Sequence, residues 1–257
     1  MTTLLTTLQA ATLTISLNRP ERANAFNFEM IAELQVALKQ ATKDAQVRCV
    51  VLTGTGGSFC AGHDITEMLA AQGQDVSYRE HLQKTYNPLI LQIRQLEKPV
   101  IAAVNGPVAG AGLGVALACD MRIAAENALF TVGFTGIGLV PDSAVSLLLP
   151  ALIGLGRATE FTFTNQPINA AQALEWGMVN RVVPESELQP ETAKLAAELA
   201  AGPVGAYGLT KRLFNKTVLP NLEEALTYEA YLQEIASKGE EHRQGVRAFL
   251  EKRIPSS

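Results

Sequence analysis

The chain alternates short runs of β-branched residues with longer segments whose apolar residues recur at helical spacing. Residues 47–53 (VRCVVLT) and 100–106 (VIAAVNG) are typical of buried strands. Residues 27–43 predict a helix, with Asn27 as its N-cap, and two more short strands are expected at 120–124 and 128–132. Strands separated by helical segments favour βαβ units, so the predicted fold class is α/β.

The pattern becomes helical after residue 143. Beyond a short strand at 179–183, residues 187–252 predict helices broken at Gly202-Pro203 and at Pro220. We therefore divide the chain into a core, residues 1–185, and a helical C-terminal region, residues 186–257. That region carries apolar residues such as Leu222, Leu226 and Ile235 beyond what a thin layer can bury alone, which indicates an oligomer.

Two further segments are assigned from local pattern alone. Residues 4–17 alternate weakly and predict one N-terminal strand, and the polar residues 70–85 predict a loop.

Composition bounds the remaining possibilities. The chain has 257 residues, 47% of them hydrophobic, which is enough to bury a sizeable core. A net charge of −4 gives no broad attraction to nucleic acid or to anionic membranes. Three cysteines without a CxxC pair disfavour a disulfide framework and a thiolate zinc site. Without a signal peptide or an apolar run of membrane-spanning length, the expected location is the cytoplasm.

Several common catalytic signatures are missing from the sequence. The three histidines have no metal-ligand spacing, and there is neither a GxSxG motif nor a phosphate-loop lysine. The glycines at 110–114 resemble a dinucleotide fingerprint, but Val115 stands where that fingerprint requires glycine. A metalloenzyme, a serine hydrolase and a P-loop NTPase are therefore disfavoured.

Two loops, residues 58–65 and 105–112, share one organisation. Each follows a buried strand, contains small residues and leads towards a helix. Small residues let backbone N–H groups approach a ligand, and a helix N-terminus leaves such groups unpaired. If the loops face each other they could form an oxyanion hole. The alternative is that their glycines only permit tight strand–helix turns.

Asp142 is the carboxylate in the most apolar setting. It follows Leu139-Val140-Pro141 and precedes an apolar helical segment, so it is either a helix N-cap or a general base. The other acidic residues favour structural roles. We expect Asp64 to cap a helix, Glu67 to be solvated, Glu160 to form a salt bridge and Asp120 to be structural.

Nine short motifs occur in a fixed order along nearly the whole chain. They are LNRP (17–20), VLTG (51–54), SFCAGHDI (58–65), KPVIAAVNG (98–106), the glycine stretch to Gly112, ACDMRIA (118–124), GLVPDS (138–143), AQALEWGMVNRVV (171–183) and FLEK (249–252). Together they resemble the enoyl-CoA hydratase/isomerase (crotonase) superfamily.

The resemblance implies a spiral of ββα turns with a helical C-terminal trimerisation region. It implies an acyl-CoA substrate, no cofactor, no nucleic-acid or membrane partner, and a homotrimer or a dimer of trimers. The oxyanion donors would be the backbone N–H groups of His63 and Ala111. The residues implied to bind CoA are Arg22, Ala23, Ala25, Ala61, Asp64, Ile65, Phe249 and Lys252, the last two closing over the nucleotide from this subunit or a neighbour. Those implied to line the acyl pocket are Phe134, Leu139 and Val140.

This chain departs from the hydratase pattern at two positions. The two glutamates of typical hydratases would fall at 114 and 134, where Gly114 and Phe134 stand. Neither residue can transfer a proton. The resemblance therefore points to isomerase-type relatives with one catalytic aspartate, here Asp142. Their reactions are Δ3,Δ2-enoyl-CoA isomerisation and a ring-type isomerisation of the phenylacetate pathway.

Other activities remain as alternatives. A hydratase, hydrolase or dehalogenase would need water or halide handling, and the dehalogenase branch carries tryptophan at the position of Phe134. A non-catalytic acyl-CoA-binding or RNA-binding scaffold is a further alternative, although the acidic composition counts against RNA.

Overall fold

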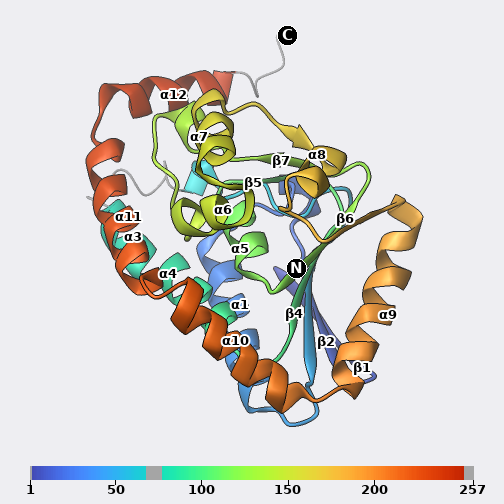
Figure 1. The fold of residues 1–257 in the computed structure, drawn as a ribbon. Helices are drawn as coiled ribbons and strands as arrows, with labels where there is room; N and C mark the ends of the chain where they lie inside the picture. The colour runs from blue at the N-terminus through green and yellow to red at the C-terminus, as the bar shows by residue number, and fades with distance from the viewer. Residues whose placement is uncertain (1, 68–76, 252–257) are drawn as a thin grey trace.

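The computed structural model describes residues 2–67 and 77–251 and contains two β-sheets. The larger sheet has the order β1-β2-β3-β4-β6-β9, with all pairs parallel except β1 and β2 (Figure 1). Its strands are β1 (Leu4–Gln9), β2 (Thr12–Leu17), β3 (Cys49–Gly54), β4 (Val100–Val104), β6 (Met121–Ala125) and β9 (Arg181–Val183). The smaller sheet contains β5 (Val108–Ala109), β7 (Leu129–Thr131) and β8 (Ile168–Asn169). The predicted α/β class is confirmed.

Strand β4 is apolar throughout and β3 is apolar from Cys49 to Leu52, because both faces of the sheet are covered. Helices α1 (Phe28–Lys43), α4 (Tyr86–Gln95) and α5 (Ala111–Ala118) contribute to the main core on one face. Helix α9 (Leu188–Ala201) covers the other face, where Leu195 and Ala196 pack with Val51 and Ile101 (Figure 1). As predicted, Asn27 caps α1, its side chain accepting the N–H of Met30 at 2.9 Å.

Two predictions from local pattern were wrong. Residues 4–17 form two antiparallel strands, because Ala10 and Ala11 adopt φ of 47° and 61° and reverse the chain without the glycine or asparagine usual there. Residues 78–84, expected in a loop, form α3 (Tyr78–Lys84), whose first turn is capped by the Ser77 hydroxyl. Residues 70–76 of the same predicted loop lie outside the described residues.

The C-terminal half is helical, as predicted, and returns to the core. Helix α11 (Leu222–Ser237) packs against α3, and α12 (Glu240–Glu251), at the upper edge of the view in Figure 1, lies on the short 3-10 helix η2 (Thr135–Ile137). The remaining elements are η1 (Pro20–Arg22), α6 (Val145–Ile153), α7 (Leu155–Thr164), α8 (Ala170–Glu175), η3 (Glu185–Glu187) and α10 (Val204–Val218). The breaks at Gly202-Pro203 and Pro220 fall where predicted. The division of the chain into a core and a C-terminal region at residue 186 stays a prediction. Helix α9, the first long helix after that boundary, packs on the large sheet of the core.

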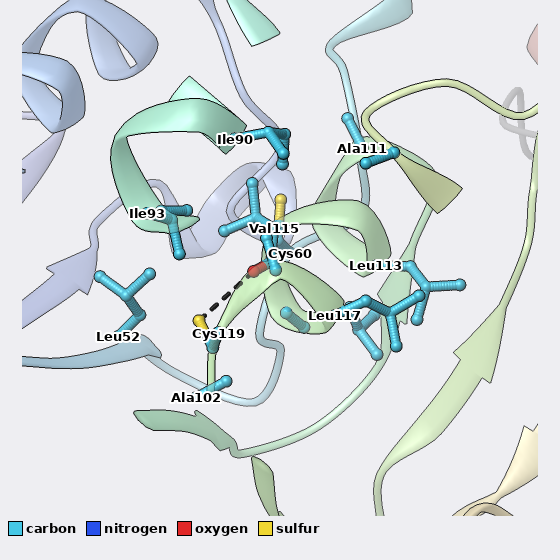
Figure 2. Close-up of a cluster of buried hydrophobic side chains, with 14 of the residues drawn as sticks. Leu52, Cys60, Ile90, Ile93, Ala102, Ala111, Leu113, Val115, Leu117 and Cys119 are labelled. Carbon is cyan, nitrogen blue, oxygen red and sulfur yellow. Dashed lines mark hydrogen bonds between the residues drawn. The ribbon is translucent and has the colours of Figure 1, made fainter. Parts of the chain in front are cut away.

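Helix α5 is buried on every side, and Figure 2 shows its core contacts. Its side chains Leu113, Val115 and Leu117 lie among those of the surrounding strands and helices. A Cβ at Gly112 would lie 2.6 Å from the carbonyl oxygen of Cys60, so only glycine lets the first turn of α5 lie this close to the 58–65 loop. No helix in residues 2–67 and 77–251 is long and apolar enough to cross a membrane.

Candidate active site

The loops at 58–65 and 105–112 lie side by side. The N–H of Phe59 donates to the carbonyl of Pro107 at 3.0 Å, and the N–H of Ala109 donates to the carbonyl of Cys60 at 2.9 Å. The Asn105 side chain ties them further, because its amide nitrogen donates to the carbonyl of Gly56 at 2.9 Å. These hydrogen bonds hold the end of the first loop against the N-terminus of α5.

Two backbone N–H groups are left unpaired where the loops meet. Ala111 is the first residue of α5, a position whose N–H has no partner within the helix. His63 lies between Gly62, whose carbonyl accepts from Phe26, and Asp64, whose N–H donates to Phe26. Neither the N–H of His63 nor that of Ala111 is hydrogen-bonded to any residue in the described part of the chain. Both residues line one cavity, so both donors are available to a ligand oxygen.

This cavity has a volume of about 430 Å³. Of the predicted site residues, those that line it are Arg22, Ala25, Ala61, His63, Asp64, Ile65, Ala111, Phe134, Leu139, Asp142 and Phe249. Ala23 and Val140 do not line it. The Ala23 carbonyl accepts the N–H of Ala61 at 3.0 Å, so it supports the wall from outside. Lys252 lies outside the described residues.

Phe249 reaches the cavity from α12 of the same chain. His242 on that helix anchors it, with Nδ1 2.8 Å from the carbonyl oxygen of Ile137 and Nε2 2.9 Å from the hydroxyl of Tyr78. Phe249 thus lines the cavity of its own chain, and its part in closing over CoA stays a prediction.

Asp142 is buried in the cavity wall. Its Oδ1 accepts a hydrogen bond from the Ser143 hydroxyl at 2.7 Å, and its Oδ2 accepts one from Gln233 Nε2 at 2.6 Å. Burial raises the pKa of Asp142 to about 6, and the two hydrogen bonds oppose that rise. The carboxyl is thus poised to exchange a proton near neutral pH.

The interpretation of Asp142 as a helix N-cap was wrong. Helix α6 begins at Val145, and its N-cap, Ala144, makes no side-chain capping hydrogen bond. Ser143 and Ala144 have φ of 55° and 63°. The first amide of the helix, the N–H of Val145, donates to the backbone carbonyl of Asp142 at 2.9 Å, while the carboxyl of Asp142 makes no bond to the helix amides and stays in the cavity wall.

Gln233, on α11, was missed by the sequence reasoning. Its Oε1 accepts the N–H of Val140 at 3.3 Å, which orients the amide so that Nε2 faces Asp142. The available signal was a polar residue inside a buried stripe. Gln233 and Glu229 lie on the same buried face of α11 as Leu222, Leu226 and Ala230.

Asp64 is the other described carboxylate in the cavity wall, and it forms an ion pair with Arg19. It lies 2.9 Å from Arg19 and accepts the hydroxyl of Thr66 at 2.6 Å. Although burial acts in the opposite direction, these bonds hold the pKa of Asp64 below its ordinary value. It also accepts the N–H of Thr66 at 3.2 Å, as a residue capping the helical turn at 65–67 does.

The remaining acidic residues give mixed results. Asp120 is structural, as expected, with Arg94 at 3.1 Å and Lys211 at 2.9 Å. Glu67 was expected in solvent, but it is half-buried and accepts the N–H of Phe28 at 3.0 Å. Glu160 is exposed, and no ion pair joins it to another described residue, so the expected salt bridge is missing.

The imidazoles of His63 and His81 are neighbours in the cavity wall, which His242 also lines. His63 Nδ1 lies 2.7 Å from the hydroxyl of Tyr86, and the rings of His63 and His81 lie 4.9 Å apart. Burial lowers the pKa of His63 to about 3 and that of His81 to about 4. Both rings are therefore neutral at neutral pH.

The place of a side chain at residue 114 is already filled. A Cβ built on Gly114 would lie 2.6 Å from both the Cβ and the carbonyl oxygen of Ser143. Phe134 is buried and lines the cavity with its apolar ring. Neither position can supply a carboxylate to hold water.

With this geometry established, the relatives of the chain can be compared. The family described as "Enoyl-CoA hydratase/isomerase" matches residues 7–256. The chain belongs to the enoyl-CoA hydratase/isomerase family. A "1,2-epoxyphenylacetyl-CoA isomerase" of Escherichia coli is 40% identical over 253 residues, 98% of this chain and 97% of that protein.

Other members of the enoyl-CoA hydratase/isomerase family carry hydratase names. A "Probable enoyl-CoA hydratase" of Rhodobacter capsulatus is 40% identical, covering 94% of this chain and 92% of that protein. A crystal structure of an enoyl-CoA hydratase from Mycobacterium avium subsp. paratuberculosis aligns with a TM-score of 0.88 and 34% identity, covering 99% of this chain and 98% of that one. The predicted crotonase fold is confirmed, and the family contains both activities.

Proposed function

We propose that this member of the enoyl-CoA hydratase/isomerase family is an acyl-CoA isomerase that moves a carbon–carbon double bond, with Asp142 as its acid/base. The proposal rests on one observation. Among the described residues, Asp142 is the one cavity carboxyl that has no cationic partner, and it shares the cavity with the unpaired N–H groups of His63 and Ala111.

The reaction begins with the thioester oxygen between the two N–H groups. They acidify the carbon next to the carbonyl, and Asp142 removes its proton. The electrons of the broken C–H bond pass into a dienolate whose negative charge is carried by the thioester oxygen. Each N–H donor contributes roughly 3 kcal/mol to lowering the barrier in enzymes where this has been measured.

Protonated Asp142 then returns the proton two carbons along the chain. The new double bond joins the carbon that lost the proton to the next carbon of the chain, the original double bond becomes a single bond, and the thioester carbonyl is restored. One carboxyl is sufficient because the donor and acceptor carbons lie on one face of the dienolate. The apolar side chains of Phe134 and Leu139 in the wall exclude water from that face.

The proposed substrate is a linear 3-enoyl-CoA or a ring-type acyl-CoA of the phenylacetate class, the latter supported by the printed name of the Escherichia coli relative. The CoA portion would follow the wall residues Arg22, Ala61 and Ile65, with Phe249 of α12 packing over it. Ala23 and Lys252 remain proposed CoA contacts.

The test uses a linear 3-enoyl-CoA and follows the ultraviolet absorbance of the conjugated product. The wild-type protein should form the 2-enoyl thioester, and Asp142→Asn should lower kcat by at least ~10² while substrate binding survives. Hydration of crotonyl-CoA should be far slower than isomerisation, because residues 114 and 134 offer no water-holding carboxylate.

Two outcomes would contradict the proposal. Asp142→Asn could retain most of its turnover, which would exclude a single-base mechanism. Alternatively, hydration of crotonyl-CoA could be the faster reaction, which would identify the chain as a hydratase.

A further inference from the structure

The turn that carries Asp142 has an unusual backbone. Ser143 and Ala144 are consecutive non-glycine residues at positive φ, 55° and 63°, and both are fully buried. Such residues keep this conformation only where surrounding groups hold it. Something in the structure must therefore hold this turn.

The group that holds it is the carboxylate of Glu229. Glu229 Oε2 accepts the N–H of Ala144 at 2.9 Å, and Oε1 accepts the N–H of Ser146 at 3.1 Å together with the Ser146 hydroxyl. Glu229 is 4% exposed and makes no ion pair with any described residue. It lies one helical turn before Gln233, the residue that holds Asp142 itself.

We propose that Glu229 is a positioning residue for Asp142: its carboxyl group accepts the N–H groups of the 143–146 turn and so keeps Asp142 buried in the cavity wall. This inference rests on the proposed function only for the part that concerns catalysis. The effect of Glu229 on the carboxyl of Asp142 exists whatever reaction the protein performs.

The role requires a carboxylate and not merely a side chain of this size. Both oxygens of Glu229 accept backbone N–H groups. A glutamine has one oxygen and one NH₂ group, so its NH₂ donor would face one of these backbone N–H donors. The turn that Glu229 holds keeps the Asp142 carboxyl buried, and burial is the main cause of its raised pKa. The charge of Asp142, after the larger effect of burial, contributes to raising the pKa of Glu229 to about 7.

Other titratable groups face Asp142 across the cavity. They are Arg22 of η1, His63 and Asp64 of the first loop, Tyr78 and His81 of α3, Tyr86 of α4 and His242 of α12. Burial keeps His63 and His81 neutral, and Asp64 is paired with Arg19. Among these residues and Glu229, therefore, Glu229 is the one carboxyl that no cation pairs with.

The experiment compares Glu229→Gln with the matched control Glu223→Gln, which removes an exposed carboxylate from the first turn of the same helix. The titration of the Asp142 carboxyl is followed by carbon NMR and assigned with Asp142→Asn. In Glu229→Gln its midpoint should move to lower pH by at least about half a unit. In the control it should not move.

Kinetics provide the second readout. In Glu229→Gln, kcat for the 3-enoyl-CoA should fall at least about tenfold while KM stays within about threefold, because the turn and not the substrate contacts is disturbed. Adding Ala144→Gly should recover part of that kcat and any lost folding, since glycine adopts a positive φ without strain. The Asp142 titration should move back towards its wild-type midpoint in this double variant, because the restored turn buries the carboxyl again.

Two results would overturn the inference. The first is an unmoved Asp142 titration in Glu229→Gln, whether or not its melting temperature falls, because that pattern marks a general structural role. The second is a double variant that recovers neither folding nor turnover. If instead the wild-type protein does not isomerise a 3-enoyl-CoA, the proposed function fails, and the NMR titration still decides whether Glu229 controls Asp142.

Discussion

His63 offers the cavity two groups, a backbone N–H and an imidazole, and they predict different behaviour. Because burial lowers the pKa of His63 to about 3, the ring stays neutral across the working range and is a weak base. We expect His63→Ala to lower kcat by about tenfold at most, since the backbone N–H remains.

The measurement is a pH–rate profile of both proteins. The acid limb of the His63→Ala profile should keep its position. A loss of ~10² or more with the fold intact, and with the limb gone, would show that the base is the imidazole and not Asp142.

The burial of Asp142 should cost stability. Its pKa in the folded protein, about 6, lies above the ordinary value of 3.8, so protonation is favoured by folding. The resulting stabilisation is fully present below about pH 4 and is lost as the pH rises through about 6. Near pH 8, Asp142→Asn should therefore raise the free energy of unfolding, by up to about 3 kcal/mol.

Thermal unfolding measured near pH 8 and near pH 4 checks the predicted stabilisation by Asp142→Asn. The difference between Asp142→Asn and the wild-type protein should shrink as the pH falls to about 4. An equal change at both pH values would mean that ionisation of Asp142 is not what burial opposes.

At the scale of elements, the site depends on how closely α5 and the 143–146 turn approach each other. A Cβ at Gly114 would lie 2.6 Å from the backbone oxygen of Ser143, so Gly114→Ala must push the turn away. We expect a loss of about 1–3 kcal/mol in stability and a fall in kcat, because Asp142 moves with the turn.

Gly156→Ala is the matched control. A Cβ at Gly156, in α7, meets nothing within 4 Å, and alanine favours a helix over glycine. Chemical denaturation and steady-state kinetics of both variants are compared. A Gly114→Ala protein as stable and active as the wild type would show that the close approach is not required.

At the scale of the whole molecule, an apolar surface lies along α10. Leu209, Leu213, Phe214 and Val218 are each more than half exposed. The sequence analysis took Leu222 and Leu226 as evidence for an oligomer, but both are buried in the chain's own core. The expected trimer-based oligomer thus rests on α10 and on the exposed Ile235 of α11.

Sedimentation at micromolar concentration tests this expectation. The wild-type protein should sediment as a trimer or a dimer of trimers, and Phe214→Glu should shift it towards smaller species. Val36→Glu, which alters an equally exposed residue of α1, should leave the mass unchanged. A monomeric wild-type protein would refute the prediction.

Local chemistry made much of the fold predictable. Buried β-branched runs became β3 and β4, and the tail helices end where Gly202-Pro203 and Pro220 stop them. These features depend on residues adjacent in sequence. The sequence singled out the 58–65 and 105–112 loops but left open whether they face each other; they meet because they follow neighbouring parallel strands.

The sequence by itself therefore determined the α/β order, the loops with free N–H groups and the candidacy of Asp142. Only the tertiary structure decided between a helix cap and a buried acid/base, since that choice depends on the backbone at Ser143 and Ala144. The groups around this turn come from far along the chain: Gln233 lies 91 residues from Asp142, and Glu229 lies 85 from Ala144. Burial by such distant residues sets the pKa of Asp142, and no local pattern encodes it.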